Sequence, residues 1–161
     1  MIQIKNGKFQ KNGLAFSPPD GYCFESRPDA EMQDGMVFFS EDGTKMIRYL
    51  FLISDEKAGT ALHHLFQKDF LGYVPYRLLL PASPIFLGGF VGFYAFYEGE
   101  ISEDGSATQY FELRIDLTGC DEGFAQFSLR VCDENADIVS FVQTDEFQSI
   151  INGISSANET V

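Results

Sequence analysis

The sequence predicts an α+β fold, an α/β/α sandwich in which helices cover the faces of a mainly antiparallel, twisted sheet of about six strands. Three observations predict it. Apolar and polar residues alternate in several segments, helical periodicity recurs between and after those segments, and a Pro-Pro-Asp-Gly turn at 18–21 ends an early strand. The length of 161 residues suits a single domain at 1–161, with an added hairpin at 1–10 and a disordered tail at 155–161.

The first forty residues predict short strands joined by tight turns. Asn-Gly pairs at 6–7 and 12–13 are strong signals for two-residue hairpin turns. The prolines at 18 and 19 cannot donate hydrogen bonds to a neighbouring strand, so they end the strand before them. The expected strands are Met1–Lys5, Lys8–Gln10, Leu14–Ser17, Tyr22–Ser26 and Met36–Ser40.

A central strand and a helix are expected next. Lys45–Ser54 has apolar residues on both faces, which is typical of a strand covered on both sides, and the Glu-Asp-Gly turn at 41–43 joins it to the preceding strand. Asp55 is a suitable cap for a helix that runs to about Lys68. The apolar stripe of this helix consists of Ala58, Ala61, Leu62, Leu65 and Phe66.

The uncharged stretch Leu78–Tyr97 has the length of a membrane-spanning helix. Its two prolines and three glycines would interrupt such a helix, so we expect no membrane span. The stretch instead predicts the strands Arg77–Leu80, Pro84–Leu87 and Phe90–Tyr97.

Two alternating segments predict an antiparallel hairpin with one buried and one solvent-exposed face. Its arms are Thr108–Leu117 and Phe124–Val131, and Asp133–Val142 after it is ambiguous and helical in part. Asp145 is expected to cap a last helix. The side chains expected outward in the hairpin are Glu112, Arg114, Asp116, Gln126, Ser128 and Arg130, and the last helix is expected to bury Phe147, Ile150, Ile151 and Ile154.

Charge and cysteines restrict the function. A net charge of −13 repels nucleic acid and anionic lipid, so neither is an expected partner. The acidity serves solubility or attracts a cationic or amphipathic partner. Cys23, Cys120 and Cys132 are odd in number and lack CxxC spacing, and residues 1–9 lack the apolar core of a secretory signal, which together predict free thiols and a cytoplasmic location.

With its elements in this order, the chain resembles the PsbP/DcrB-like superfamily of small α/β/α sandwiches. The resemblance spans residues 8–154. It is carried by the strand and Pro-containing turn at 14–22, a long helix after a central strand, the Gly-rich aromatic strand at 88–94, a two-stranded hairpin, and the closing Ile-Ile-Asn-Gly-Ile at 150–154. Members are often exported or lipid-anchored and often have tryptophan where Tyr22 stands, which are departures. Their mostly non-enzymatic roles imply a protein-binding sheet surface, and no functional residue carries over.

Several motifs suggest chemistry, and each has a simpler explanation. His63 and His64 are adjacent on a helix and point about 100° apart, so we expect surface histidines rather than joint metal ligands. The cysteines have no catalytic signature around them. Gly88, Gly89 and Gly92 precede an aromatic strand rather than a helix, so they favour close strand approach over phosphate binding.

The remaining residues considered for a functional site are carboxylates and aromatics. Asp133, Asn135 and Asp137 match the first three ligand positions of a calcium loop, but the later glycine and glutamate are missing, so we expect no calcium site. The acids expected in solvated turns are Glu98, Glu100, Glu103, Asp104, Asp121 and Glu122. The aromatics expected in the core are Phe38, Phe39, Phe51, Phe90, Phe93, Phe96 and Phe111, while Tyr73, Tyr76, Tyr94 and Tyr97 belong either to the core and its edge, which is favoured, or to a groove.

We therefore expect a non-catalytic, cytoplasmic protein-binding module. Its most concrete form, taken from the resemblance, is an acidic chaperone or adaptor similar to the chaperones of bacterial secretion effectors. The expected partner is another protein with a basic or amphipathic segment, and a homodimer remains open. No catalytic residue, cofactor or metal is expected, and the sequence does not assign the partner-binding residues. Two alternatives remain: a carrier of a small apolar ligand in an aromatic-lined cavity, and an enzyme with dispersed catalytic residues.

Overall fold

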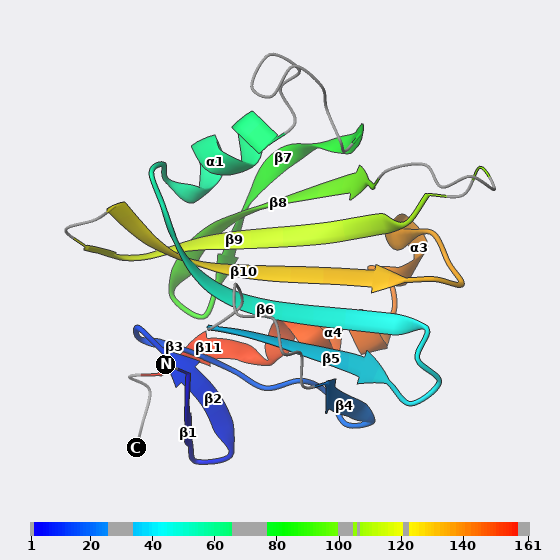
Figure 1. The fold of residues 1–161 in the computed structure, drawn as a ribbon, viewed down its shortest axis with the longest axis horizontal. Coiled ribbons are helices and arrows are strands. Elements are labelled where there is room, and N and C mark those ends of the chain that lie inside the picture. The colour runs from blue at the N-terminus through cyan, green and yellow to red at the C-terminus, as the bar shows by residue number, and fades with distance from the viewer. Residues whose placement is uncertain are drawn as a thin grey trace.

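In the computed structural model, the chain forms two antiparallel sheets of four and seven strands (Figure 1). The structure describes residues 2–25, 34–65, 77–99, 105, 107–120 and 123–157. The small sheet has the order β1-β2-β3-β11, with strands β1 (Gln3–Lys5), β2 (Lys8–Lys11), β3 (Leu14–Phe16) and β11 (Ile154–Ser156). The large sheet has the order β4-β5-β6-β10-β9-β8-β7, with strands β4 (Tyr22–Glu25), β5 (Gly35–Ser40), β6 (Lys45–Ser54), β7 (Arg77–Leu87), β8 (Phe90–Glu98), β9 (Gln109–Cys120) and β10 (Gly123–Asp133).

The described helices are too short to form the layers of an α/β/α sandwich. They are α1 (Ala58–Leu65), α3 (Ile138–Phe141) and α4 (Asp145–Asn152), of eight, four and eight residues. The fold is mainly β, so the predicted sandwich of about six strands is wrong, whereas the mainly antiparallel pairing is confirmed. The difference arises because the short N-terminal strands pair with β11 and build a second sheet.

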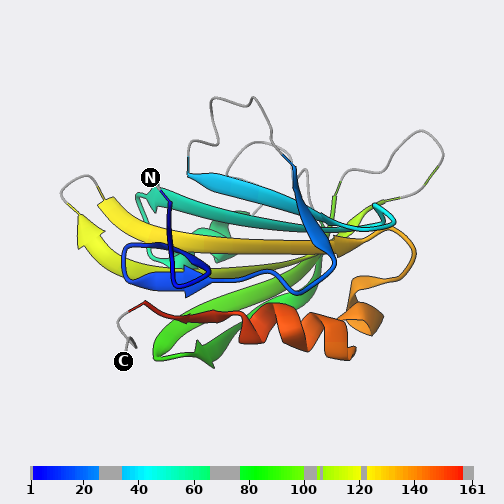
Figure 2. The same cartoon turned by 90° about the horizontal axis from the view of Figure 1, so that it is seen from below.

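One face of the large sheet, which we call the core face, packs against the small sheet and α4. The ring of Phe16 in β3 stacks on Tyr49 in β6 at 4.0 Å between centroids, and Phe147 in α4 meets Phe111 in β9 edge-on at 5.0 Å. Figure 2 shows α4 and β11 along one side of the strongly curved large sheet. Each large apolar side chain buried here stabilises the fold by about 1.5–3 kcal/mol, so this face is the main hydrophobic core.

The opposite face of the large sheet, which we call the outer face, carries α1. This helix packs against β7, β8 and β9. Its first residue, Ala58, donates its backbone N–H to Asp116 Oδ1 at 2.8 Å, so the helix begins at Ala58 rather than directly after Asp55. Of the predicted range, residues 66–68 lie outside the described part of the chain.

The predicted hairpin of two alternating segments is present as β9 and β10, and its inward residues are buried as expected except Leu117, which is partly buried. The expectation of a solvent-exposed second face is wrong at its centre, because Glu112, Gln126 and Ser128 on the outer face are all 0% exposed. Polar side chains in the middle of a sheet can be buried where they satisfy one another.

The uncharged stretch forms a second hairpin, β7 and β8, closed by a turn at Gly88 and Gly89. Both glycines have positive φ, 52° and 89°, a conformation that favours glycine. The two strands expected at 77–80 and 84–87 form one strand, β7, with register shifts between Leu78 and Ser83. Within the described residues, no helix has the length and apolarity needed to cross a membrane.

The chain ends differently from the prediction. Thr144, not Asp145, is the N-cap of α4, because its side chain accepts the N–H of Phe147 at 3.2 Å. Ile154, expected on the helix, begins β11, which pairs with β3. Ser155 and Ser156 therefore belong to a strand within the range expected to be a tail, and residues 158–161 lie outside the described part.

Candidate functional site

Carboxylates gather at one end of the large sheet, where the β5–β6 turn, the end of β10 and the start of α4 meet. Lys45 is the register partner of Asp133, and the backbone N–H of Glu134 donates to Thr44 at 2.8 Å. Figure 1 shows this end at the right, beside α3. We call it the acidic end; its carboxylates are Asp20, Glu41, Asp42, Asp133, Glu134, Asp137, Asp145 and Glu146.

Lys45 is the one cation among the described residues that line the two open depressions of the acidic end. It is already paired, because its Nζ lies 3.2 Å from Glu146 Oε2. The same carboxylate accepts a hydrogen bond of 2.8 Å from the hydroxyl of Tyr22. Negative charge therefore exceeds positive charge strongly at this end of the molecule.

Hydrogen bonds within a turn and at a helix start stabilise the ionised form of two of these carboxylates. Asp42 accepts hydrogen bonds from the Ser40 hydroxyl at 2.7 Å and from the N–H and hydroxyl of Thr44 at 3.1 and 2.8 Å, which lower its pKa to about 2. Asp137 accepts from the N–H of Ser140 at 2.8 Å, which lowers its pKa as well. Asp42 and Asp137 therefore carry their negative charges at neutral pH.

The Asp-x-Asn-x-Asp motif proves to have structural roles at this end. Asp133 accepts the N–H of Asn135 at 2.8 Å, and Asp137 is the N-cap of α3. Over the described ranges, no group of three or more His, Cys, Asp or Glu side chains is arranged to hold a metal ion.

The other candidates from the sequence do not assemble into one site. Cys23 is exposed in β4 and Cys132 is buried in β10, on strands separated by β5 and β6. His63 and His64 lie in α1, and Cys120 ends β9. Glu98 accepts a hydrogen bond from Gln109 Nε2 at 3.2 Å. Tyr73, Tyr76, Glu100, Glu103, Asp104, Asp121 and Glu122 lie outside the described residues.

The glycines of the aromatic strand serve packing. A Cβ on Gly92 would lie 2.9 Å from Arg114 O on the neighbouring strand, so the close approach of β8 and β9 requires a residue without a side chain here. Gly88 and Gly89 form the β7–β8 turn.

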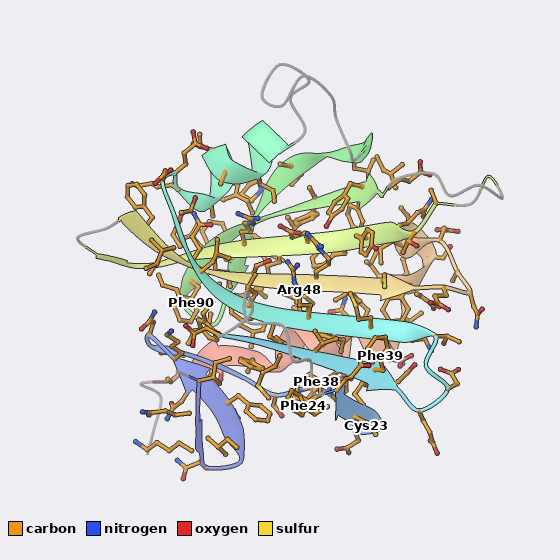
Figure 3. All side chains as sticks on the ribbon, in the orientation of Figure 1. Cys23, Phe24, Phe38, Phe39, Arg48 and Phe90 are labelled. Carbon is orange, nitrogen blue, oxygen red and sulfur yellow. The ribbon has the colours of Figure 1, made fainter. Side chains whose placement is uncertain are left out.

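The aromatics divide between the core and its edges. Tyr97 is fully buried and Phe51, Phe96 and Phe111 nearly so, while Phe90 and Tyr94 are half-buried and pack against the core. Phe39 and Phe93 are half-buried on the outer face, so the prediction that they belong to the core is wrong. Figure 3 shows Phe24 and Phe38 side by side, and their rings lie 5.6 Å apart between centroids. Phe24 is 54% exposed and so extends the core to the surface at the edge strand β4.

Sequence reasoning missed a charged cluster at the centre of the outer face. Glu112 in β9 is surrounded by Arg48 from β6, Arg130 from β10, and Arg114 two residues along its own strand. We call these four residues the guanidinium cluster. Its signal in the sequence was the charged residues at alternate positions of Thr108–Leu117 and Phe124–Val131, but the register that brings them together with Arg48 comes only from the fold.

Contacts in the guanidinium cluster are short around Glu112. Arg114 Nε donates to Oε2 at 2.9 Å, and Arg130 donates to Oε1 through Nε at 3.0 Å and Nη2 at 2.8 Å. The Tyr97 hydroxyl donates to Oε1 at 3.0 Å. Burial alone would raise the pKa of Glu112, but the guanidinium groups of Arg130, Arg114 and Arg48 lower it to about 2.

Comparison with known proteins gives a likeness of fold. No protein-family model and no curated protein matches the sequence. Among solved structures, the crystal structure of LpqN, which is involved in cell envelope biogenesis of Mycobacterium tuberculosis, is similar with a TM-score of 0.56 and 15% sequence identity. The match covers 88% of this chain and 82% of that chain. At this identity the likeness concerns the fold alone.

Proposed function

We propose that the protein is a non-catalytic protein-binding module, an adaptor or chaperone, and that its acidic end receives a basic or amphipathic segment of a partner protein. The observation that carries the proposal is the gathering of eight carboxylates around a single lysine that is already paired. Such a field attracts and orients a basic segment before contact. Membership of the PsbP/DcrB-like superfamily and a cytoplasmic location are part of this proposal.

The local structure supports a recognition role. Asp42 and Asp137 are fixed by turn and cap hydrogen bonds, so a partner would meet charges that are already in place. Binding to fixed groups costs less conformational entropy than ordering flexible ones. Val139 in α3, two residues after Asp137, is 39% exposed and offers an apolar contact for an amphipathic segment.

The alternative of a small apolar ligand carrier finds less support. Aromatic rings of the core pack directly on one another, as Phe16 does on Tyr49 at 4.0 Å and Phe51 on Phe127 at 5.2 Å between centroids. Phe16 and Tyr49 meet directly between the two sheets, where such a carrier would need an open cavity.

The experiment measures binding of a synthetic lysine-rich amphipathic peptide by titration calorimetry at several salt concentrations. Affinity should fall as salt rises, because exposed charges are screened. Glu134→Lys places a positive charge at the acidic end and should weaken binding about fivefold, equivalent to about 1 kcal/mol.

Asp55→Lys is the matched control. Asp55 is exposed next to the far end of β6, whose ten residues separate it from the β5–β6 turn, and each substitution raises the net charge of −13 by two. Binding by Asp55→Lys should match the wild type. The proposal is wrong if the wild type does not bind the peptide or if the two variants weaken binding equally, since only a general charge effect would then remain.

A further inference from the structure

In the guanidinium cluster, Arg48 and Arg114 both form their ion pairs with the same carboxylate, Glu112. Three arginines face one carboxylate, and their side chains are only 16–19% exposed. Among the described residues, Arg48 and Arg114 form ion pairs with Glu112 and with no other acid. Asp116, the next carboxylate along the outer face of β9, accepts instead from the N–H of Ala58 and from Gln126.

Arg48 is the member of the cluster with the poorest contacts. Its Nη2 lies 3.9 Å from Glu112 Oε1 and 3.4 Å from the Ser128 hydroxyl, both long for a hydrogen bond. Its Nε is buried without a partner. Burial and the positive charge of Arg130 lower the pKa of Arg48. A buried guanidinium group whose N–H donors lack acceptors lowers the stability of the fold, and a ligand that supplies the acceptors would recover it.

Arg130 and Arg114 are fixed, by contrast, and would hold a ligand in a defined position. The guanidinium of Arg130 lies over the stacked rings of Tyr97 and Tyr110, 5.7 and 5.4 Å from their centroids, while it also contacts Glu112. Arg114 is held through its Nε, and its guanidinium remains partly exposed to solvent. Figure 3 shows Arg48 in the middle of the large sheet, among these strands.

We propose that the guanidinium cluster is a binding site for an oxyanion, a carboxylate or phosphate group, which takes the donors of Arg48 and Arg114 that Glu112 leaves unused. Planar guanidinium groups bind such anions through paired N–H donors. The bound anion would offset the positive charge of Arg48 and Arg114 that Glu112 alone does not balance. The site lies on the outer face and is independent of the acidic end.

The test is a titration with inorganic phosphate at constant ionic strength, with chloride as the balancing anion, followed by calorimetry. Arg48→Gln should bind phosphate at least about tenfold more weakly, the loss expected for one charged hydrogen bond. Lys8→Gln is the matched control, because it removes one positive charge at an exposed position of β2 and should bind as the wild type does. Parallel titrations with acetate separate the two ligand sources, since tighter binding of acetate indicates a carboxylate and tighter binding of phosphate a phosphoryl group.

A second readout uses the wild-type protein and does not depend on how the variants fold. The Nε–Hε nuclear magnetic resonance signal of Arg48, assigned by its absence in Arg48→Gln, should move with phosphate or acetate and stay in place with chloride. The proposal is overturned if this signal does not move, or if Arg48→Gln binds as tightly as Lys8→Gln.

Discussion

The hydroxyl of Tyr22 donates a 2.8 Å hydrogen bond to Glu146, which joins β4 at the edge of the large sheet to the first turn of α4, 124 residues later in the chain. Tyr22 is half-buried. Burial, the hydrogen bond and the negative charge of Glu146 together raise the pKa of Tyr22, so its hydroxyl remains a donor at neutral pH. The bond therefore fastens the C-terminal helix to the edge strand.

Tyr22→Phe should lower the free energy of unfolding by about 1 kcal/mol, the net value of one such hydrogen bond. Glu146 keeps its contact with Lys45, so the substitution leaves no carboxylate without a partner. Urea denaturation followed by circular dichroism measures the change.

Tyr49→Phe also removes a tyrosine hydroxyl, but at this position we expect no loss of stability. The Tyr49 hydroxyl is buried and has no hydrogen-bond partner in the described structure. Removing it should leave stability unchanged or raise it slightly. Equal losses in the two variants would contradict this account of the Tyr22 hydrogen bond.

Alternation of apolar and polar residues was sufficient to predict β9 and β10, because each buries a row of alternate side chains, while β6 was predicted from apolar residues on both of its faces. The same pattern misassigned Glu112, Gln126 and Ser128 to solvent. Periodicity shows which side chains share a face, but not whether a polar row is covered and satisfied by partners from distant strands. Strand β11 could not be predicted from its own sequence either. Its three residues form a strand because Ile154 pairs with Phe16 of β3.

Glu112→Gln should destabilise the protein by about 3–5 kcal/mol at pH 7, because it leaves three largely buried guanidinium groups without their shared counter-charge. Glu41→Gln, at an exposed turn position, is the control and should have little effect. Urea denaturation at pH 7 measures both. A loss below 1 kcal/mol for Glu112→Gln would contradict the central position of this carboxylate.

The destabilisation by Glu112→Gln should shrink as the pH falls. The pKa of Glu112 is about 2 in the folded protein and near its usual 4.5 in the unfolded chain, so its contribution is present above pH 4.5 and is lost as the pH falls towards 2. That shift corresponds to about 3 kcal/mol. Comparing the wild type with the variant at each pH cancels the titration of the other acids. A difference that stays constant from pH 5 to pH 2.5 would contradict the lowered pKa.

Gly92→Ala tests the close approach of β8 and β9. The added Cβ would lie 2.9 Å from Arg114 O, 3.0 Å from Ile115 Cγ1 and 3.1 Å from Leu113 Cδ1. Because one of these atoms belongs to the backbone, relief requires a strand to shift, and stability should fall by about 1–3 kcal/mol. Thermal and urea denaturation measure it, and an unchanged stability would show that the strands are more loosely packed than the structure indicates.

Cysteine labelling distinguishes the exposed edge of the large sheet from its interior. Cys23 in the edge strand β4 should react with iodoacetamide within minutes at pH 8, because its side chain is exposed. Cys132 should resist, since it is only 6% exposed and burial raises its pKa to about 11, which leaves little reactive thiolate at that pH. Mass spectrometry of the digested protein measures each site, and labelling in urea provides the fully reactive reference. Equal labelling of both thiols in the native protein would mean that the end of β10 opens readily, and the acidic end, which contains Asp133 next to Cys132, would then lack the fixed geometry that the proposed partner recognition requires.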